Sequence, residues 1–337
     1  MIEVQNLVKR FGAKVAVDDV SFTIGDGEVV GFLGPNGAGK STTMNIITGY
    51  MSSTSGGVSI GGIDILEDPI GAKRQIGYLP EQPPLYTDMT VREYLNFVYE
   101  LKGCQLNRKK HLEEICKVVK ITDDYNKNRL IKNLSKGYKQ RVGIAQALIG
   151  NPSIIILDEP TVGLDPKEII EIRSLIRNLG RAHTVILSTH ILSEVQAVCD
   201  RILIINSGKL IADEKTESVV NALEGNRRLS ARICGPQRDI LHALRAMPEV
   251  TRAESVGERE GDSFLYAIES SSGVDVRKPL FNMLAAKGWP LIGLAQQGTS
   301  LEDIFVSLVD AKKDTKKERE LPKFDIKVTE EVRKEEN

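Results

Sequence analysis

The sequence predicts an α/β protein followed by a smaller α+β unit. Over residues 1–213, strand-like and helix-like apolar patterns alternate, which is typical of α/β proteins. Residues 154–157 form a continuous Ile-Ile-Ile-Leu run, as expected for a parallel strand covered on both faces. Later strand and helix patterns have a spacing typical of a small α+β sandwich. We therefore expect a first domain over residues 1–213, a linker over 214–227 and a second domain over 228–310.

The strands of the first domain are expected where apolar residues alternate or run together. Alternation marks the first two strands, and continuous apolar runs mark buried strands. The expected strands cover residues 3–7, 16–24, 28–33, 57–60, 75–79, 154–157, 184–188 and 201–205.

Helices of the first domain are expected between these strands. One begins at Lys40 and is closed by Gly49, and Thr90 is the expected N-cap of the helical pattern over residues 90–120. The expected helices cover residues 40–49, 90–120, 135–149, 168–179 and 192–198.

The second domain combines four strand patterns with three helix patterns. The strands are expected over residues 228–233, 250–256, 264–268 and 290–295, and the helices over 237–246, 274–287 and 300–309. The final segment, residues 311–337, is rich in Lys and Glu and has little apolar surface to bury. We expect this tail to be solvated or disordered.

The composition excludes several classes of protein. Apolar residues make up 41% and charged residues 27%, which supports buried cores and excludes a wholly disordered or collagen-like chain. The 45 basic and 46 acidic residues leave a net charge of −1, so we expect no nucleic-acid partner. No run approaches the ~18 apolar residues that span a bilayer, and the N-terminus lacks the apolar stretch of a secretory signal. We expect a globular protein that does not itself cross a membrane.

The four cysteines are scattered without C-x-x-C spacing, which predicts reduced thiols in a cytosol. His111 falls between Cys104 and Cys116. A zinc site there would need a fourth ligand and closer pairs, so we interpret these three as ordinary helix-face residues.

Residues 34–41 form a motif that we call the phosphate cradle. They match G-x-x-x-x-G-K-[ST], with a predicted strand before them and a predicted helix after them. Glycines allow backbone N–H groups to point at phosphate oxygens, the helix start adds positive potential, Lys40 adds charge and Ser41 ligates Mg²⁺. A glycine-rich turn needed only for its backbone shape would not require the Lys-Ser pair. The residues expected to bind the nucleotide here are Gly34, Pro35, Asn36, Gly37, Ala38, Gly39, Lys40, Ser41 and Thr42.

Two acidic residues follow the apolar run at 154–157. Asp158 is expected at the carboxyl end of this strand, where open α/β sheets bind ligands, and there it would hold Mg²⁺ through water. Glu159 is expected to polarise a water for in-line attack on the γ-phosphate. The alternative for Glu159 is a solvated charge at the rim.

By these and further motifs, residues 1–213 resemble the nucleotide-binding subunit of an ATP-binding-cassette (ABC) transporter. Residues 134–138, Leu-Ser-Lys-Gly-Tyr, resemble the signature motif of that family, and Gln82 after Gly-Tyr-Leu-Pro-Glu resembles its Q-loop. Asp165 resembles the D-loop aspartate and His190 the switch histidine. The resemblance implies the P-loop ABC ATPase fold, with a mixed sheet core and a helical subdomain.

The resemblance also implies a role for each matching residue. Ser135 and Gly137 open a helix and would contact the γ-phosphate of ATP held by the opposite subunit. Gln82 would sense Mg²⁺ or the attacking water. His190 would contact the γ-phosphate, and the alternative is a histidine that caps the helix beginning near residue 192. By the same resemblance, Asp165 would be one of the nucleotide-binding residues.

Phe11 occupies the position where the family places an aromatic that stacks on adenine. A buried core aromatic is the alternative.

The signature motif departs from the family pattern, because Lys136 replaces its first glycine and Tyr138 its glutamine. Lys136 either faces solvent or adds charge near the phosphate, and both positions stay open.

The function implied is that of the ATP-binding, ATP-hydrolysing subunit of an ABC transporter. Its cofactors would be ATP and Mg²⁺, and its partners a second copy of itself, in an ATP-dependent dimer, and integral membrane permease subunits. Export is expected, because the altered signature motif resembles those of sodium-export, drug-resistance and gliding-motility subunits. The expected location is cytoplasmic, peripheral at the inner face of the cell membrane. Residues 83–86 and the helix from Val91 lie where the family receives coupling helices.

Two other classes of protein fit the sequence less well. A soluble ABC ATPase of translation or DNA repair would have two cradles or a long coiled coil. This chain has one cradle, and about 94 residues separate Lys40 from Leu134. A small-molecule phosphotransferase would need an acceptor pocket, for which the sequence gives no pattern.

Overall fold

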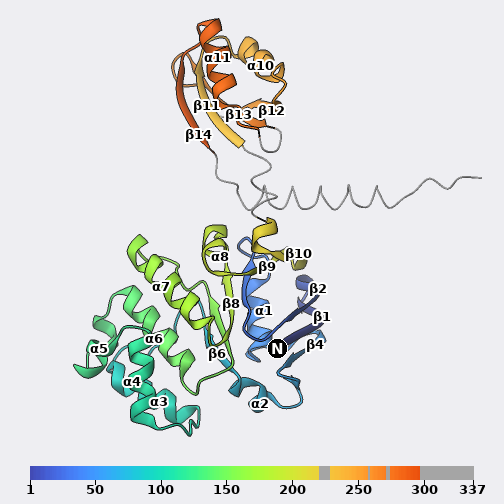
Figure 1. The fold of residues 1–337 in the computed structure, drawn as a ribbon. Helices are drawn as coiled ribbons and strands as arrows, with labels where there is room; N and C mark the ends of the chain where they lie inside the picture. Colours follow the sequence, from blue (N-terminus) through green and yellow to red (C-terminus); the bar gives the residue numbers. More distant parts are fainter. Residues whose placement is uncertain (220–227, 257–258, 271–273, 297–337) are drawn as a thin grey trace, which may run out of the picture.

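The computed structural model describes residues 1–219, 228–256, 259–270 and 274–296 (Figure 1). The expected helix over 300–309 and the tail over 311–337 lie outside these residues. The division of the chain near residues 213 and 228 stays a prediction.

Two sheets form the first part of the chain. A four-stranded sheet has the order β2-β1-β4-β5, and a six-stranded sheet has the order β10-β9-β3-β8-β7-β6. The strands of the six-stranded sheet pair in parallel except for β10, which is antiparallel to β9. This is the expected mixed sheet. The strands are β1 (Ile2–Phe11), β2 (Lys14–Ile24), β3 (Val29–Leu33), β4 (Ser55–Ile60), β5 (Ile63–Asp64), β6 (Ile76–Leu79), β7 (Ile154–Asp158), β8 (Thr184–Thr189), β9 (Arg201–Asn206) and β10 (Lys209–Lys215).

The helices of this part include the five expected regions and additional short ones. The expected helical stretch over 90–120 is two helices, because residues 102–107 form a turn in which Gly103 has a φ of 57°. The α2 and α5 helices and the β5 strand were not anticipated from the sequence. The helices are α1 (Lys40–Ile47), α2 (Pro69–Arg74), α3 (Val91–Leu101), α4 (Arg108–Val118), α5 (Thr122–Asn126), η1 (Ile131–Asn133), α6 (Lys136–Leu148), α7 (Pro166–Leu179) and α8 (Leu192–Val198).

Thr90 caps α3, as predicted. Its hydroxyl accepts a hydrogen bond from the Glu93 backbone N–H over 3.2 Å, and the Glu93 carboxylate accepts one from the Thr90 N–H over 2.8 Å. These reciprocal bonds form a capping box. The bonds that the Thr90 N–H and hydroxyl donate to the Glu93 carboxylate hold its pKa below the usual value. The local sequence therefore predicts the start of this helix correctly.

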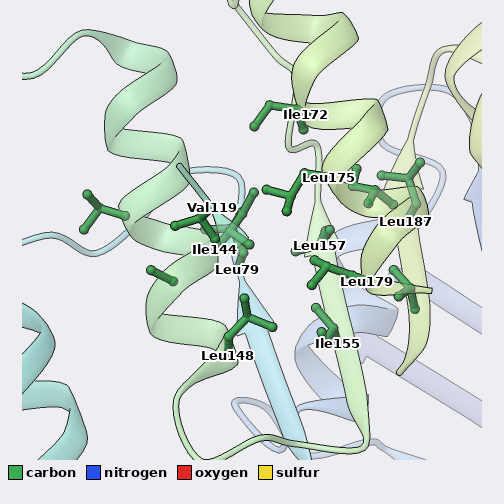
Figure 2. Packing of buried hydrophobic residues seen from close by; sticks show 14 of the residues in the cluster. Leu79, Val119, Ile144, Leu148, Ile155, Leu157, Ile172, Leu175, Leu179 and Leu187 are labelled. Atoms are coloured by element: carbon green, nitrogen blue, oxygen red, sulfur yellow. The ribbon is translucent and has the colours of Figure 1, made fainter. Parts of the chain in front are cut away.

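The six-stranded sheet has an apolar core on each face. Along β7, Ile155 and Leu157 belong to the core that the helices α3 to α8 cover, whereas Ile154 and Ile156 belong to the core under the four-stranded sheet. Figure 2 shows Ile155 and Leu157 on the helix-covered side, among leucines and isoleucines of α6 and α7. Burial on both faces explains the unbroken apolar run, since each buried side chain contributes about 1.5–3 kcal/mol.

The second part of the chain is a four-stranded antiparallel sheet with two helices. Its sheet order is β12-β13-β11-β14. One apolar core joins the sheet residues Leu229, Ala231 and Ile233 to Ile240 and Leu280 of the helices. The expected strands and the first two expected helices are present within a few residues. The elements are β11 (Arg228–Cys234), α10 (Gln237–Arg245), β12 (Val250–Ser255), β13 (Ser263–Ser270), α11 (Arg277–Lys287) and β14 (Leu291–Gln296).

The helices of the described residues are too short or too polar to span a membrane.

His111 has a structural partner in the loop after α6. Its Nε2 accepts a hydrogen bond from the Gly150 backbone N–H over 3.0 Å, which requires an unprotonated nitrogen. Burial lowers the pKa of His111, nearby Lys102 lowers it further, and Glu114 opposes the shift. Within the described ranges, no group of three His, Cys, Asp or Glu residues is placed to hold a metal. His111 therefore joins α4 to the loop after α6.

Acidification should destabilise the chain through His111. Because its pKa is lower in the folded state, the unfolded chain binds more protons as the pH falls through the ordinary histidine range. We expect wild type to lose unfolding free energy relative to His111→Gln between pH 7.5 and 5.5, since Gln does not titrate and its oxygen can accept the same bond. Denaturant unfolding of both proteins at each pH measures this. A difference that does not change with pH would contradict it.

Candidate functional site

The phosphate cradle connects β3 to α1, and its shape depends on two close backbone approaches. A Cβ on Gly34 would lie 2.3 Å from the Ile205 carbonyl oxygen, and one on Gly39 would lie 2.5 Å from the Ala16 oxygen. Gly39 also has a φ of 107°, a conformation that favours glycine. The buried Lys40 amine donates to the Gly34 oxygen over 2.8 Å and to the Pro35 oxygen over 3.3 Å. The loop thus curves around the ammonium group.

A pocket of about 610 Å³ opens beside the phosphate cradle, and we call it the nucleotide pocket. Nine of its lining residues were predicted site residues: Phe11, Asn36, Gly37, Gly39, Lys40, Ser41, Thr42, Glu159 and His190. Four further lining residues were not predicted: Lys14, Ala16, Glu81 and Val162. Glu81 lines the pocket where its neighbour Gln82 was expected. The packing that brings Lys14 and Ala16 of β2 beside the cradle has no signal in a local motif.

Asp158 ends β7 as a buried carboxylate, 2% exposed. Its Oδ1 has no hydrogen-bond partner among the described residues, and neither has the hydroxyl of Ser188, its partner across β7 and β8. A buried oxygen without a partner is costly and favours a cation or an ordered water nearby. The Asp158 charge and burial raise the pKa of the Tyr78 hydroxyl, burial more strongly.

Glu159 connects the phosphate cradle to His190. One of its oxygens lies 3.5 Å from Lys40 Nζ, and both lie 3.0 Å from His190 Nδ1. Glu159 is 6% exposed, so the alternative of a solvated rim charge is wrong. Its backbone has a φ of 48°, which is uncommon outside glycine, and its N–H donates to the Ser188 oxygen over 2.8 Å. A strained backbone and a buried ion pair together are typical of functional sites.

His190 follows β8 directly and does not cap the next helix. The N-cap of α8 is Ile191, with no side-chain capping bond, and the Ile191 N–H donates to the Thr189 hydroxyl over 3.1 Å. The alternative of a capping histidine is therefore wrong. The imidazole is turned toward Glu159 and the nucleotide pocket.

The signature motif lies away from the nucleotide pocket of the same chain. Ser135 is the N-cap of α6, accepts a bond from the Tyr138 N–H and donates to Glu168 Oε1, both over 3.3 Å. Gly137 is packed so closely that a Cβ would lie 2.2 Å from the same Glu168 oxygen. Asp165 is the N-cap of α7 and accepts from the Glu168 N–H over 2.9 Å. None of Ser135, Gly137 or Asp165 lines the pocket.

Lys136 is exposed and lies against the D-loop of its own chain. A Cβ on Gly163 would lie 2.2 Å from the Lys136 amine. The side chain that replaces a glycine in the signature motif thus extends over the segment between Glu159 and Asp165.

Comparisons with known proteins agree with this geometry. A family model described as ABC transporter matches residues 17–162. The linearmycin resistance ATP-binding protein LnrL of Bacillus subtilis is 33% identical over 310 residues, which cover 91% of this chain and 98% of that protein. The bacitracin transport ATP-binding protein BcrA of Bacillus licheniformis is 37% identical over 215 residues, covering 63% and 69%.

Solved structures show the same likeness. The dimeric structure of the ATP-binding cassette MJ0796 bound to ADP and Pi matches with a TM-score of 0.58 and 31% identity. The match covers 64% of this chain and 99% of that one.

The two glycines at the turn of the phosphate cradle should respond differently to alanine. In Gly37→Ala the only destabilising effect is the positive φ of the alanine, since no atom lies within 4 Å of its Cβ position. In Gly39→Ala the new Cβ also clashes with the Ala16 oxygen. We expect Gly37→Ala to cost about 1 kcal/mol and Gly39→Ala about 2 kcal/mol more. Denaturant unfolding compares the two, and equal losses would contradict the role of the Ala16 contact.

Proposed function

The chain belongs to the ATP-binding subunits of ABC transporters, and we propose that ATP closes two copies of it into a dimer that energises export through separate membrane subunits. Members of this family bind and hydrolyse ATP. The observation that carries the proposal is the position of Glu159, which contacts Lys40 and His190 inside the nucleotide pocket.

We propose that ATP lies with its phosphates on the phosphate cradle. Lys40 and the start of α1 present positive potential to the phosphate oxygens. Phe11 lines the pocket and is 48% exposed, so it is not the buried core aromatic of the alternative. An exposed ring at this place supports stacking on the adenine.

The residues around Asp158 fit a magnesium ion. The Asp158 oxygen without a partner is an anionic donor of the kind that Mg²⁺ prefers, and Ser41 lines the pocket at the start of α1. We propose that Ser41, Asp158 through water, and Gln82 hold the ion. When bound, Mg²⁺ neutralises charge on the transferred phosphate.

The contact between Glu159 and His190 inside the nucleotide pocket supports a role for both in the hydrolytic step. We propose that the Glu159 carboxylate accepts a proton from the attacking water, and that His190 orients the γ-phosphate. When the phosphates arrive, they also compete with Glu159 for the Lys40 charge, because the amine lies within 3.5 Å of the carboxylate. This competition would release Glu159 toward the water.

The second copy supplies what the nucleotide pocket of one chain lacks. Ser135, Gly137 and Asp165 line no part of their own pocket, and the similar cassette MJ0796 has a dimeric structure. We propose that these residues contact ATP held by the partner copy. Dimer closure therefore depends on ATP, and hydrolysis reopens the dimer.

Replacing Glu159 should separate ATP binding from hydrolysis. We expect Glu159→Gln to lower kcat about 100-fold or more, because it removes the general base, and to form a stable dimer with ATP. Light scattering with and without ATP measures the dimer. As a control, Lys40→Ala combined with Glu159→Gln should remain monomeric. Wild-type turnover by Glu159→Gln, or dimerisation of the double variant, would contradict the proposal.

A groove of about 470 Å³ beyond the Q-loop is the proposed contact with the membrane subunit. Its walls include Tyr86 and Phe97, whose rings meet edge to face at 5.5 Å, and the exposed Tyr50 and Leu101. Exposed apolar side chains gathered along a groove are typical of protein interaction sites. We propose that this groove receives a coupling segment, which would place the chain at the inner face of the membrane.

Two relatives support export as the direction of transport. LnrL is described as a linearmycin resistance protein and BcrA as a bacitracin transport protein, and these descriptions support our proposal of export.

Acidic substitutions in the groove should separate docking from ATP hydrolysis. Tyr50 is 80% and Leu101 is 72% exposed, so we expect Tyr50→Glu and Leu101→Glu to fold normally and keep the ATPase rate of the isolated chain. Each should abolish co-purification with a co-expressed membrane subunit. Val118→Glu, on the exposed face of α4, is the matched control and should co-purify like wild type. Undiminished co-purification of the groove variants would contradict this docking surface.

A further inference from the structure

Glu194 is a buried carboxylate that the proposed hydrolytic step does not use. It lies in the first turn of α8 and is 1% exposed. Burying a carboxylate is costly unless hydrogen bonds and a counter-charge offset the lost solvation. Arg173 of α7 provides the charge, with its Nη2 3.8 Å from Glu194 Oε1.

Each oxygen of Glu194 accepts a hydrogen bond from a different threonine. The Thr161 hydroxyl donates to Oε1, and the Thr189 hydroxyl donates to Oε2 over 2.8 Å. Both threonines are buried, at 4% and 0% exposure. A single carboxylate thus joins two segments that are remote in sequence.

These two threonines flank the proposed catalytic residues. Thr161 follows Glu159 by two positions, after β7, and Thr189 directly precedes His190, at the end of β8. Glu159 needs external support, because its φ of 48° is strained and such strain persists only where surrounding contacts hold it. Glu194 contacts the segment after Glu159 through Thr161, and the segment before His190 through Thr189.

We propose that Glu194 is a positioning residue for ATP hydrolysis, fixing the segment that carries Glu159 against the segment that carries His190. The inference rests on the proposed function, because it takes the roles of Glu159 and His190 from it. Arg173 adds a third segment, since its helix begins just after Asp165 of the D-loop. The position of α7 is therefore connected to both catalytic side chains through one carboxylate.

Threonine variants test the proposal without creating a buried cavity. Thr161→Val and Thr189→Val keep the side-chain shape and remove the hydroxyl, whereas Thr161→Ser and Thr189→Ser keep the hydroxyl. We expect each Val variant to lower kcat about tenfold with the KM for ATP within about twofold, because the reacting groups are misplaced while the ATP contacts remain. The Ser variants should recover most of the wild-type kcat. The Val double variant should be little worse than the worse single variant, since both remove one shared tether.

Thr184→Val is the matched control. Thr184 is a buried threonine at the opposite end of the same strand, and its hydroxyl accepts a bond from the Gly27 N–H over 2.9 Å. We expect it to lower unfolding free energy as the other Val variants do and to leave kcat unchanged. The proposal is overturned if Thr161→Val and Thr189→Val keep wild-type kcat, or if Thr184→Val loses as much kcat as they do.

Glu159→Gln, assayed in parallel, distinguishes a failure of the Glu194 proposal from a failure of the proposed function. If it is inactive while the Val variants keep full kcat, Glu194 has no positioning role and the proposed function stands. If Glu159→Gln hydrolyses ATP at the wild-type rate, the proposed role of Glu159 fails, and the role of Glu194 fails with it.

Discussion

The parallel pairing of β3, β8 and β7 is the constraint on which the site depends. Because the three strands run in the same direction, their carboxyl ends meet at one edge of the sheet. That edge receives the phosphate cradle after β3, Glu159 after β7 and His190 after β8. An apolar core on each face fixes the strands, so the ends of three distant segments are held within contact distance of one another.

The charges at this edge fit the proposed action on a polyphosphate better than a role in stabilising the fold. Lys40 and Glu159 are both buried, and a buried ion pair recovers little of the free energy lost on leaving water. The Asp158 oxygen without a partner adds a further cost. Such costs are typical of sites whose groups are held ready for a ligand. The tether through Glu194 fits this arrangement, since strained and charged segments need rigid support.

The chain also separates two sets of residues that the proposed function needs together. The phosphate cradle, Glu159 and His190 line one pocket, and the signature motif with Asp165 lies outside it. Glu168, in the first turn of α7, accepts a hydrogen bond from the signature serine and donates its backbone N–H to Asp165, so it connects the two parts of the second set. The proposed dimer, in which each copy offers the second set to its partner's pocket, brings both sets together, and the similar cassette MJ0796 has a dimeric structure.

The sequence by itself determined the features that are encoded locally. The cradle motif, the apolar strand before Asp158, the Thr90 cap and the alternation of strands and helices are each contained in a short window, and the structure contains all of them. The division of the 90–120 stretch into two helices was missed, because a glycine turn between helical patterns is a weak signal.

Only the tertiary structure decided which distant groups meet. It placed Glu81, Lys14 and Ala16 in the pocket, excluded a rim position for Glu159 and a capping role for His190, and laid Lys136 against Gly163. It also joined Thr161 and Thr189 through Glu194. These contacts follow from the order of strands, from the packing of the two sheets and from the packing of the helices, and no local pattern of residues specifies such long-range geometry.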